Sequence, residues 1–263
     1  MERYGTALIL ANVAARSYAP HVAGFDEFFG EDYLYFWEQV LPEERSDREA
    51  DLIWRLLELE PGMEVLDLAC GHGRLANRLA ERGVRVTGLD SSALFLERAR
   101  ADAAARSVEV EYVEGDMRAI PWQERFDRVF NWFTAFGYHP DDELHGILRG
   151  VRAALKPGGR FALETISVSA LMTRFSRAGV TERDGDFLVD LRTFDPVAGG
   201  VRSEYVAIRG GETRRYELFV RMPTFPELRD WLLGAGFTRV EAYGEDGEPL
   251  TYDHRRLVAV AQA

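Results

Sequence analysis

The sequence has little cysteine: Cys70 is the only one in 263 residues. An intramolecular disulfide and a zinc site built from several cysteines are therefore excluded. A single cysteine fits a reducing compartment, so we expect a cytoplasmic protein. Long apolar runs are also missing, because Asn12 interrupts the apolar stretch near the N-terminus, which is too short to span a membrane. Glu2 beside Arg3 is untypical of the basic start of a signal peptide.

Runs of basic residues are absent as well, and the formal net charge is −12 with a pI near 5.0. Arginines alternate with acidic residues, as in ERSDREAD and RGGETRRYE. Nucleic-acid-binding proteins normally present a basic surface or stripe. We therefore expect no nucleic acid and no membrane surface as a partner. The length and a composition of 46% hydrophobic and 29% charged residues indicate a globular α/β protein, as one large domain or one domain with an insertion.

Residues 1–60 are predicted to form a helical N-terminal cap. Aromatic residues are concentrated between Phe25 and Leu41. They either pack against the core or form a lid in which Tyr33 and Trp37 cover a ligand. Ser46 followed by Glu49 has the spacing of a capping box and predicts the start of the next helix.

Strand-like and helix-like segments alternate from Met63 to Glu164. This alternation predicts a parallel sheet with helices on both faces. Residues 180–223 break the pattern with three strand-like segments joined by glycine-containing turns, which predicts an inserted antiparallel β-meander. Thr224 followed by Glu227 is a second capping box, and two final strand-like segments return to the sheet. The predicted nucleotide-binding domain therefore comprises residues 61–179 and 224–263.

The stretch VLDLACGHGRLA predicts a strand, a tight glycine turn and a helix that aims its N–H groups at a ligand. Gly71-x-Gly73-x-x-Ala76 also fits the dinucleotide fingerprint. Asp90 follows Gly71 at nearly the spacing of roughly 20 residues expected for a ribose-binding acid, so NAD is permitted. Asp90 can alternatively be a helix N-cap, or it can bind the ligand while Ser91 or Ser92 caps the helix.

Three other features favour a different nucleotide. Asp67 lies inside the first strand, where a buried carboxylate needs a partner, such as the glycine loop or the ammonium group of a ligand. Gly115-Asp116-Met117 follows the third strand, where an acid can accept a hydrogen bond from an adenine amino group. FNWFTAFGY ends the fourth strand, and LKPGGRF begins the fifth.

In this order, VLDLACGHG, GLDSS, EGDM and LKPGGRF resemble the class I S-adenosylmethionine-dependent methyltransferases. The resemblance covers roughly residues 63–164. It implies a Rossmann-like sheet of seven strands, mostly parallel, with an antiparallel edge hairpin. It also implies S-adenosylmethionine as cofactor, with Gly71 and Gly73 near its methionine, Asp90 at its ribose, and Asp116 and Met117 at its adenine. Ala69 stands where many members have glycine, and we expect alanine to be small enough.

Ligands of open α/β sheets bind at the carboxyl ends of the strands. Asn131 and Trp132 follow the fourth strand, as do Tyr138 and His139, and Glu164 follows the fifth. His139 is the first candidate for a general base, because imidazole titrates near pH ~6.5; its alternative is a solvated loop histidine. Glu164 either binds an amine or merely ends its strand, and Tyr138 either lines the acceptor site or packs in the core. The predicted site is completed by Asn131 on the cofactor side and Trp132 on the acceptor side; no metal is expected.

The acceptor predicted for the methyl group is a small molecule. The Asn-Pro-Pro-Tyr-type motif of base and glutamine methylation is missing, since the chain reads Asn131-Trp132-Phe133-Thr134. Transfer to nitrogen or oxygen is predicted, with nitrogen favoured. The alternatives are a C-methyltransferase, an NAD-dependent oxidoreductase and a cofactor-binding protein without catalysis. The meander forms a roof over the acceptor or a homodimer contact.

Overall fold

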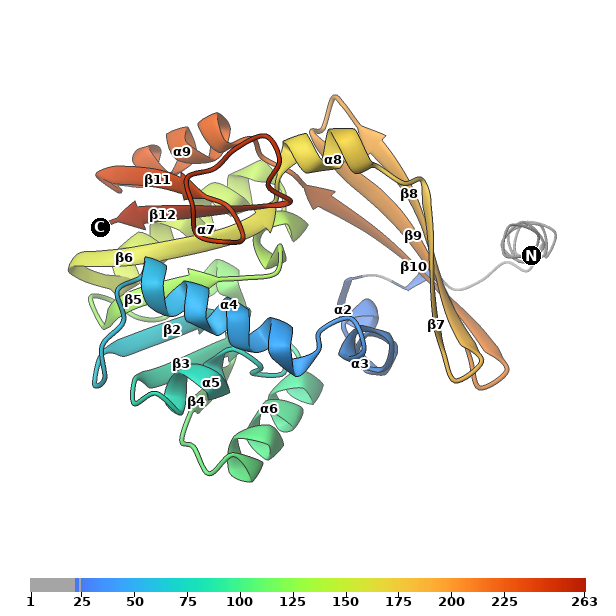
Figure 1. Cartoon of the computed structure of the whole chain (residues 1–263), viewed down its shortest axis with the longest axis horizontal. Coiled ribbons are helices and arrows are strands. Elements are labelled where there is room, and N and C mark those ends of the chain that lie inside the picture. The colour runs from blue at the N-terminus through green and yellow to red at the C-terminus, as the bar shows by residue number, and fades with distance from the viewer. Residues whose placement is uncertain (1–21, 24) are drawn as a thin grey trace.

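The computed structural model describes residues 22–23 and 25–263, which form two β-sheets with helices packed on and between them. One sheet has seven strands and is flanked by helices; it lies on one side of the molecule and the smaller sheet on the other (Figure 1). The predicted N-terminal cap lies in part outside these ranges, at residues 1–21 and 24.

The larger sheet has the strand order β11-β12-β6-β5-β2-β3-β4. Its strands are β2 (Glu64–Leu68), β3 (Arg85–Asp90), β4 (Glu111–Glu114), β5 (Phe126–Asn131), β6 (Leu155–Ile166), β11 (Arg239–Tyr243) and β12 (Arg256–Gln262). Only β12 runs antiparallel to its neighbours β6 and β11, while the other pairs are parallel. The prediction of a mostly parallel, Rossmann-like sheet with an antiparallel edge hairpin is confirmed.

Helices cover both faces of this sheet, because each presents an apolar stripe to it. One core contains side chains of α4 (Glu43–Leu56), α5 (Ala76–Ala80) and α6 (Ala93–Ala105). The other contains side chains of α7 (Asp141–Ala154) and α9 (Phe225–Gly234). Two short 3₁₀ helices, η1 (Met117–Ala119) and η2 (Ala135–Tyr138), follow the carboxyl ends of β4 and β5.

The smaller sheet has the order β1-β10-β9-β8-β7. The three strands expected in the meander are present as β8 (Asp186–Asp195), β9 (Gly200–Arg209) and β10 (Glu212–Arg221). Two strands were not expected: β7 (Ala178–Arg183), which pairs with β8, and the short β1 (Val22–Ala23), which runs parallel to β10. A seven-residue helix, α8 (Val168–Arg174), leads from β6 into this sheet.

Two N-terminal helices, α2 (Phe25–Phe28) and α3 (Glu31–Glu38), lie between the two sheets (Figure 1). The buried carboxylate of Asp32 anchors α3 to the smaller sheet. It accepts hydrogen bonds from Arg214 Nε at 2.7 Å, from Tyr216 Oη at 2.8 Å and from Arg209 Nη1 at 3.2 Å. Because these donors belong to β9 and β10, the cap helix is fixed mainly to the inserted sheet.

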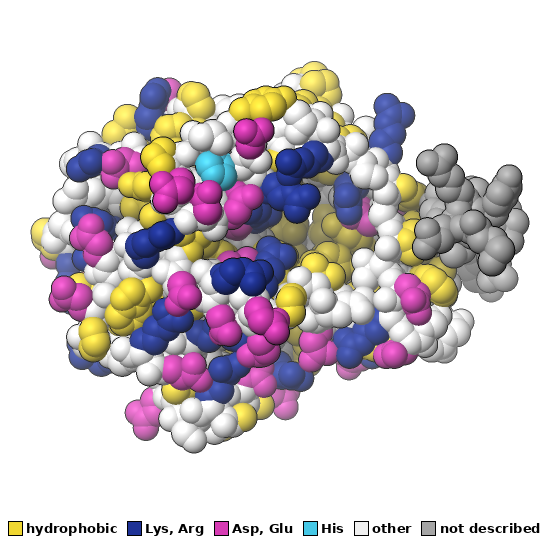
Figure 2. Space-filling view, in the orientation of Figure 1, with side chains coloured by type: hydrophobic (Ala, Val, Ile, Leu, Met, Phe, Trp, Pro, Cys, Tyr) yellow, Lys and Arg dark blue, Asp and Glu magenta, His cyan; other side chains and the backbone are white. Residues whose placement is uncertain are grey.

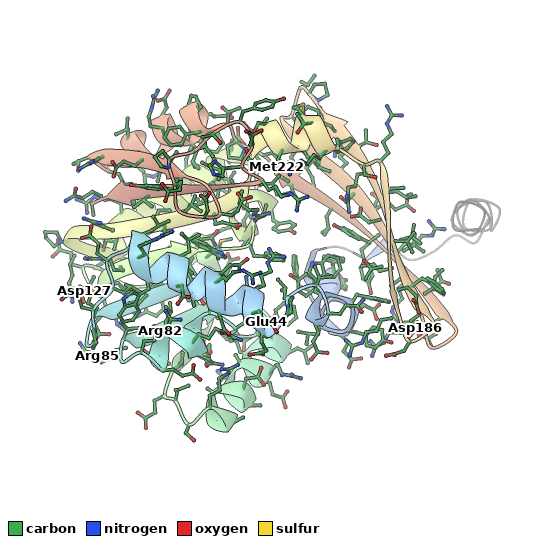
Figure 3. The ribbon with its side chains drawn as sticks, viewed as in Figure 1. Glu44, Arg82, Arg85, Asp127, Asp186 and Met222 are labelled. Atoms are coloured by element: carbon green, nitrogen blue, oxygen red, sulfur yellow. The ribbon has the colours of Figure 1, made fainter. Side chains whose placement is uncertain are left out.

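The surface is hollowed between the two sheets, with apolar side chains deep in the hollow and charged side chains around it (Figure 2). Figure 3 shows Asp127 and Arg85 on the side of the molecule away from this hollow, and Asp186 at the far end of the smaller sheet. Asp127 binds Lys156 Nζ and the Glu64 backbone N–H, both at 2.8 Å. These contacts lie at the amino ends of β2 and β5. The described residues include no helix that is long and apolar enough to cross a membrane.

Candidate active site

A cavity of about 470 Å³ lies at the carboxyl ends of β2, β3, β4 and β5, beneath α3. It brings together most of the predicted site residues: Tyr33, Trp37, Asp67, Ala69, Gly71, Asp90, Ser91, Asp116, Met117, Trp132, Tyr138 and His139. Gly73, Asn131 and Glu164 are not part of its lining. Across the described ranges, no group of three His, Cys, Asp or Glu side chains is arranged to hold a metal ion.

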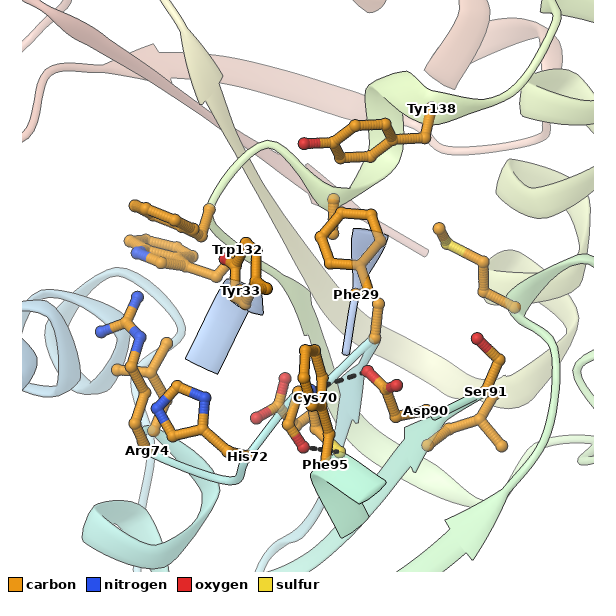
Figure 4. A pocket seen from close by; sticks show the side chains of 18 of the residues that line it. Phe29, Tyr33, Cys70, His72, Arg74, Asp90, Ser91, Phe95, Trp132 and Tyr138 are labelled. Carbon is orange, nitrogen blue, oxygen red and sulfur yellow. Dashed lines mark hydrogen bonds between the residues drawn. The ribbon is translucent and has the colours of Figure 1, made fainter. Parts of the chain in front are cut away.

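Asp90 ends β3 and connects it to the glycine loop (Figure 4). Its Oδ2 accepts the Gly71 N–H at 2.7 Å, and its Oδ1 accepts the Ser92 N–H at 2.9 Å. A carboxylate can accept about four hydrogen bonds, so acceptor capacity remains for a ligand hydroxyl. Burial raises the pKa of Asp90, while these backbone donors oppose the shift. Ser92, rather than Asp90, caps α6 through the Phe95 N–H.

Asp67 is buried, with 2% of its surface exposed. Burial raises the pKa of Asp67 to about 8; Asp90 adds to the shift, whereas Arg74 and the Ala76 backbone N–H oppose it. A buried carboxyl that lacks a cationic partner takes up a proton, and an adjacent cation reverses this. The cavity wall therefore carries an acid that favours a positively charged ligand group.

The loop after β2 has a left-handed backbone at Ala69, Gly71 and Gly73, with φ values of 58°, 56° and 75°. Gly71 faces the cavity, and a Cβ there would approach only the Phe95 ring, at 3.9 Å. A Cβ on Gly73 would overlap the Tyr112 side chain, so this glycine allows α6 and β4 to pack closely. The expectation that alanine fits easily at position 69 needs correction, because an L-residue in this conformation costs about 1–2 kcal/mol.

Asp116 and Met117 line the cavity near η1, and Arg118 engages the acid. Asp116 accepts the Arg118 backbone N–H and its Nε–H, both at 2.8 Å. These bonds hold the pKa of Asp116 below its usual value. The carboxylate is therefore ionised and fixed in place, with acceptor capacity left for a further donor.

His139 and Tyr138 form the side of the cavity beneath the smaller sheet. His139 Nδ1 lies 3.4 Å from Glu143 Oε2. Burial, and next the Arg118 charge, lower the pKa of His139, so its imidazole is neutral near pH 7. Burial raises the pKa of Tyr138 well above its usual value, so it stays a neutral phenol.

Glu164 and Asn131 lie behind the cavity wall. Glu164 forms a buried ion pair with Arg256 and accepts the Phe133 N–H at 2.8 Å. This arrangement favours the alternative in which Glu164 merely ends its strand and does not contact substrate; its carboxylate supports the loop after β5. Asn131 is fully buried, and its Nδ2 donates to the Leu68 carbonyl at 2.9 Å. It therefore joins β5 to β2 and is not positioned to reach a ligand.

Aromatic side chains form another wall of the cavity, where Tyr33, Trp132 and Tyr138 lie across from Asp90 (Figure 4). Tyr33 and Trp37 stack with ring centroids 4.8 Å apart, and Phe29 meets Tyr138 edge-on at 5.2 Å. Several lining residues were not predicted, namely Phe29, His72, Arg74, Phe95, Arg118 and Phe133. Phe29 lies in the aromatic segment noted in the sequence, and His72 and Arg74 lie in the glycine loop itself; both locations could have indicated them.

Comparison with known proteins identifies the family. Residues 65–159 match a family model described as a methyltransferase domain. The chain is 31% identical to the cypemycin N-terminal methyltransferase of Streptomyces sp over 215 residues, which cover 76% of this chain and 83% of that protein. The chain belongs to the S-adenosylmethionine-dependent methyltransferases. The alternative of an NAD-dependent oxidoreductase is therefore wrong.

Solved methyltransferase structures share the fold. The CcbJ methyltransferase of Streptomyces caelestis has a TM-score of 0.75 at 23% identity, covering 91% of this chain and 99% of that one. An S-adenosylmethionine-bound amino pentose methyltransferase of Micromonospora echinaspora, CalS10, has a TM-score of 0.61 at 22% identity, covering 84% and 90%. At this identity the likeness concerns the fold alone.

The cavity of this methyltransferase fits S-adenosylmethionine. The cofactor has a sulfonium, an amino group, a carboxylate and two ribose hydroxyls. Asp67 is a buried acid suited to a cationic group, and Asp90 retains acceptor capacity for a hydroxyl.

Proposed function

We propose that this methyltransferase transfers the methyl group to a nitrogen or oxygen of a small molecule, with nitrogen favoured. The observation that carries the proposal is the combination of an acidic edge and an aromatic wall in one cavity. The edge contains Asp67, Asp90 and Asp116, and the wall includes Tyr33 and Trp37. Aromatic faces attract a sulfonium or a protonated amine by about 0.5–2 kcal/mol.

In this proposal, one side of the cavity holds the cofactor. Asp90 accepts the ribose hydroxyls, with Ser91 beside it, and Asp116 and Met117 contact the adenine. Asp67 neutralises the amino group, and the backbone from Ala69 to Gly71 allows the methionine part to approach closely. When bound, the cofactor supplies a methyl group on a positively charged sulfur. The chain then has to align an acceptor lone pair and exclude water.

The opposite side takes the acceptor. Tyr33, Trp37, Trp132 and Tyr138 enclose it, and the neutral imidazole of His139 removes a proton where the acceptor needs it. We also propose that residues 1–60 act as the cap of the domain formed by residues 61–179 and 224–263. Residues 180–223 would form the roof of the acceptor site, with a homodimer contact as the alternative.

Nitrogen is favoured for two reasons. A neutral amine brings its own lone pair, whereas a hydroxyl benefits much more from a base. Among the described residues that line the cavity, His139 is the imidazole placed on the proposed acceptor side. Relatives point the same way by name: one acts at the N-terminus of cypemycin, and a structural neighbour, KedS8, is called a sugar N-methyltransferase. Another relative is named for transfer to an oxygen of a rifamycin, so oxygen remains in the proposal.

The test is product analysis with S-adenosylmethionine labelled with carbon-13 in its methyl group. The purified chain is incubated with matched amines, alcohols and acidic-carbon compounds, and the methyl carbon shift is read by NMR. We expect labelled N-methyl products, with S-adenosylhomocysteine released in equal amount. Exclusive C-methyl products would overturn the proposal, as would an enzyme that methylates only macromolecules.

A further inference from the structure

The segment that follows β5 has an unusual backbone. Phe133 and Thr134 are consecutive residues in the left-handed region, with φ values of 61° and 64°. Glycine adopts this conformation freely, but a residue with a side chain is disfavoured there, and a β-branched residue such as threonine especially so. Two such residues in a row persist only where surrounding groups hold them, and strain of this kind clusters at functional sites.

Glu164, at the end of the neighbouring strand β6, binds both strained residues. Its Oε2 accepts the Phe133 N–H at 2.8 Å, and its backbone carbonyl accepts the Thr134 N–H at 3.2 Å. Only 2% of Glu164 is exposed, so water does not readily replace these bonds. A different backbone at Phe133 and Thr134 would therefore leave buried polar groups without partners.

Arg256, on β12, fixes the Glu164 carboxylate in turn. Its Nε and Nη2 donate to the two carboxylate oxygens, and Nη2 also donates to Thr134 Oγ1 at 2.7 Å. The guanidinium carbon lies over the Phe133 ring, 5.9 Å from its centroid. Arg256 thus contacts the side chains of both strained residues, whereas Glu164 binds their backbones.

The strained segment carries the side of the cavity that we propose for the acceptor. Five of its residues line the cavity: Trp132, Phe133, Ala135, Tyr138 and His139. Trp132 and Tyr138 lie across from Asp90 (Figure 4). Glu164 and Arg256 are not part of the lining. They can therefore influence an acceptor only through the segment that they hold.

The far end of the segment is fixed against the smaller sheet. A Cβ on Gly137 would come within 2.5 Å of the Arg221 carbonyl oxygen, so η2 packs directly on β10. The charge of Arg256 reaches Tyr138 beside it, where it opposes the rise in pKa that burial causes. With η2 docked at one end, the contacts at Phe133 and Thr134 determine how the chain enters the acceptor side.

We propose that Glu164 and Arg256 are positioning residues for methyl transfer. They hold Phe133 and Thr134 in the left-handed backbone and thereby place Trp132 and Tyr138 around the acceptor. The location of the acceptor side rests on the proposed function, but the proposal is independent of whether nitrogen, oxygen or carbon receives the methyl group.

Two substitutions of Glu164 test this role. Glu164→Gln keeps an oxygen that can accept the Phe133 N–H, whereas Glu164→Leu has none. Release of S-adenosylhomocysteine is measured with the amines, alcohols and acidic-carbon compounds of the product analysis, because it counts every transfer whichever atom is methylated. Glu164→Leu should lower kcat/KM for the acceptor by about tenfold or more through misplacement of the wall. Its affinity for S-adenosylhomocysteine by calorimetry should stay within about threefold, and Glu164→Gln should stay within about threefold in both measurements.

A second readout needs no acceptor. The chain is labelled with 5-fluorotryptophan, and the fluorine-19 resonance of Trp132 is identified by its loss in Trp132→Phe. Because Trp132 directly precedes Phe133, its resonance should shift or split in Glu164→Leu and keep its position in Glu164→Gln. Thr134→Val, which removes only the hydroxyl that Arg256 binds, tests the same contacts in a nearly isosteric protein and should also move the resonance.

Glu111→Leu is the control. Glu111, on β4, likewise binds an arginine, Arg125, and it accepts a threonine hydroxyl, Thr87 Oγ1, at 2.9 Å, but it is not part of the cavity lining. This variant should keep the turnover, the affinity for S-adenosylhomocysteine and the Trp132 resonance of the unaltered chain.

The proposal is overturned if the Trp132 resonance is unchanged in Glu164→Leu or, should that protein not fold, in Thr134→Val. It is also overturned if Glu164→Leu weakens S-adenosylhomocysteine as much as it lowers kcat/KM, or if Glu164→Gln is impaired equally. Failure of the proposed function is a separate result, seen in the products of the unaltered chain, and the Trp132 resonance still decides whether Glu164 holds the segment.

Discussion

The carboxylate of Asp90 joins the ends of two neighbouring strands. Its Oδ2 accepts the Gly71 N–H at 2.7 Å, and its Oδ1 accepts the Ser92 N–H at 2.9 Å. One side chain thereby fixes the glycine loop and the start of α6 and still keeps acceptor positions toward the cavity. Loop geometry and the proposed ribose binding therefore depend on the same group.

Asp90→Ala should weaken binding of S-adenosylhomocysteine by at least about tenfold, because the ribose hydroxyls lose a charge-assisted partner. Titration calorimetry measures the affinity, and urea unfolding verifies that the variant is folded. Asp102→Ala is a suitable control, since Asp102 lies on the adjacent α6 and pairs with Arg98 outside the cavity lining. Unchanged affinity in a folded Asp90→Ala protein would remove Asp90 from the proposed cofactor site.

His139→Ala should lower turnover by about 10²-fold or more for an acceptor that must lose a proton, while cofactor affinity stays the same. The reason is that His139 lies on the side proposed for the acceptor and is held neutral by burial. Steady-state rates and calorimetry on the same preparation separate the two effects. His254→Gln serves as the control, because His254 pairs with Asp246 away from the cavity lining. Full turnover in His139→Ala would show that no base is used there, as for an amine that arrives neutral.

Asp67 makes the stability of the cofactor-free protein depend on pH. Its folded pKa of about 8 exceeds the unfolded value of about 3.9, so the folded state holds a proton that the unfolded state has released. The resulting stabilisation is complete below about pH 4 and is lost as the pH rises toward 8. The slope approaches about 1.4 kcal/mol per pH unit at most for one proton.

Urea unfolding between about pH 7.5 and 8.5 measures this effect, because His72, whose folded pKa is lowered to about 4, is then deprotonated in the unfolded state as well. The free energy of unfolding should fall across this interval in the unaltered chain and change less in Asp67→Asn. Equal slopes in the two proteins would mean that Asp67 is ionised in the folded state.

Ala69→Gly should raise the free energy of unfolding by about 0.5–1 kcal/mol, because glycine adopts the left-handed conformation of this position without steric cost. Chemical denaturation gives the difference. Ala104→Gly, at an exposed position in α6, should change stability in the opposite direction by a similar amount. A destabilised Ala69→Gly protein would show that the alanine methyl group contributes more packing energy than its backbone conformation costs.

Local sequence patterns predicted the start of a helix correctly where the capping residues alone determine it. The Thr224–Glu227 capping box is present at the start of α9 as predicted. The similar Ser46–Glu49 pair does not start a helix, because α4 begins at Glu43 behind Pro42 and Ser46 lies inside it. Two acidic residues in the first turn stabilise the earlier start through the helix dipole, a contribution that the capping pattern alone does not include.

The site was predictable where residues follow strand ends and less so where distant segments meet. Asp67, Asp90 and Asp116 line one cavity because the carboxyl ends of parallel strands share an edge. The partner of Glu164, Arg256, comes from β12, and no local signal pairs these two residues. Arg74 likewise finds Glu49 on α4, across a helix contact that sequence spacing does not show.

The most direct test of the account is calorimetric titration of the full chain with S-adenosylhomocysteine and, separately, with NAD. We expect S-adenosylhomocysteine to bind and NAD to give no signal, because the cavity contains a buried acid suited to an amino group and belongs to a methyltransferase. Binding of NAD without binding of S-adenosylhomocysteine would contradict the assignment of Asp67, Asp90 and Asp116 and the methyl transfer derived from it.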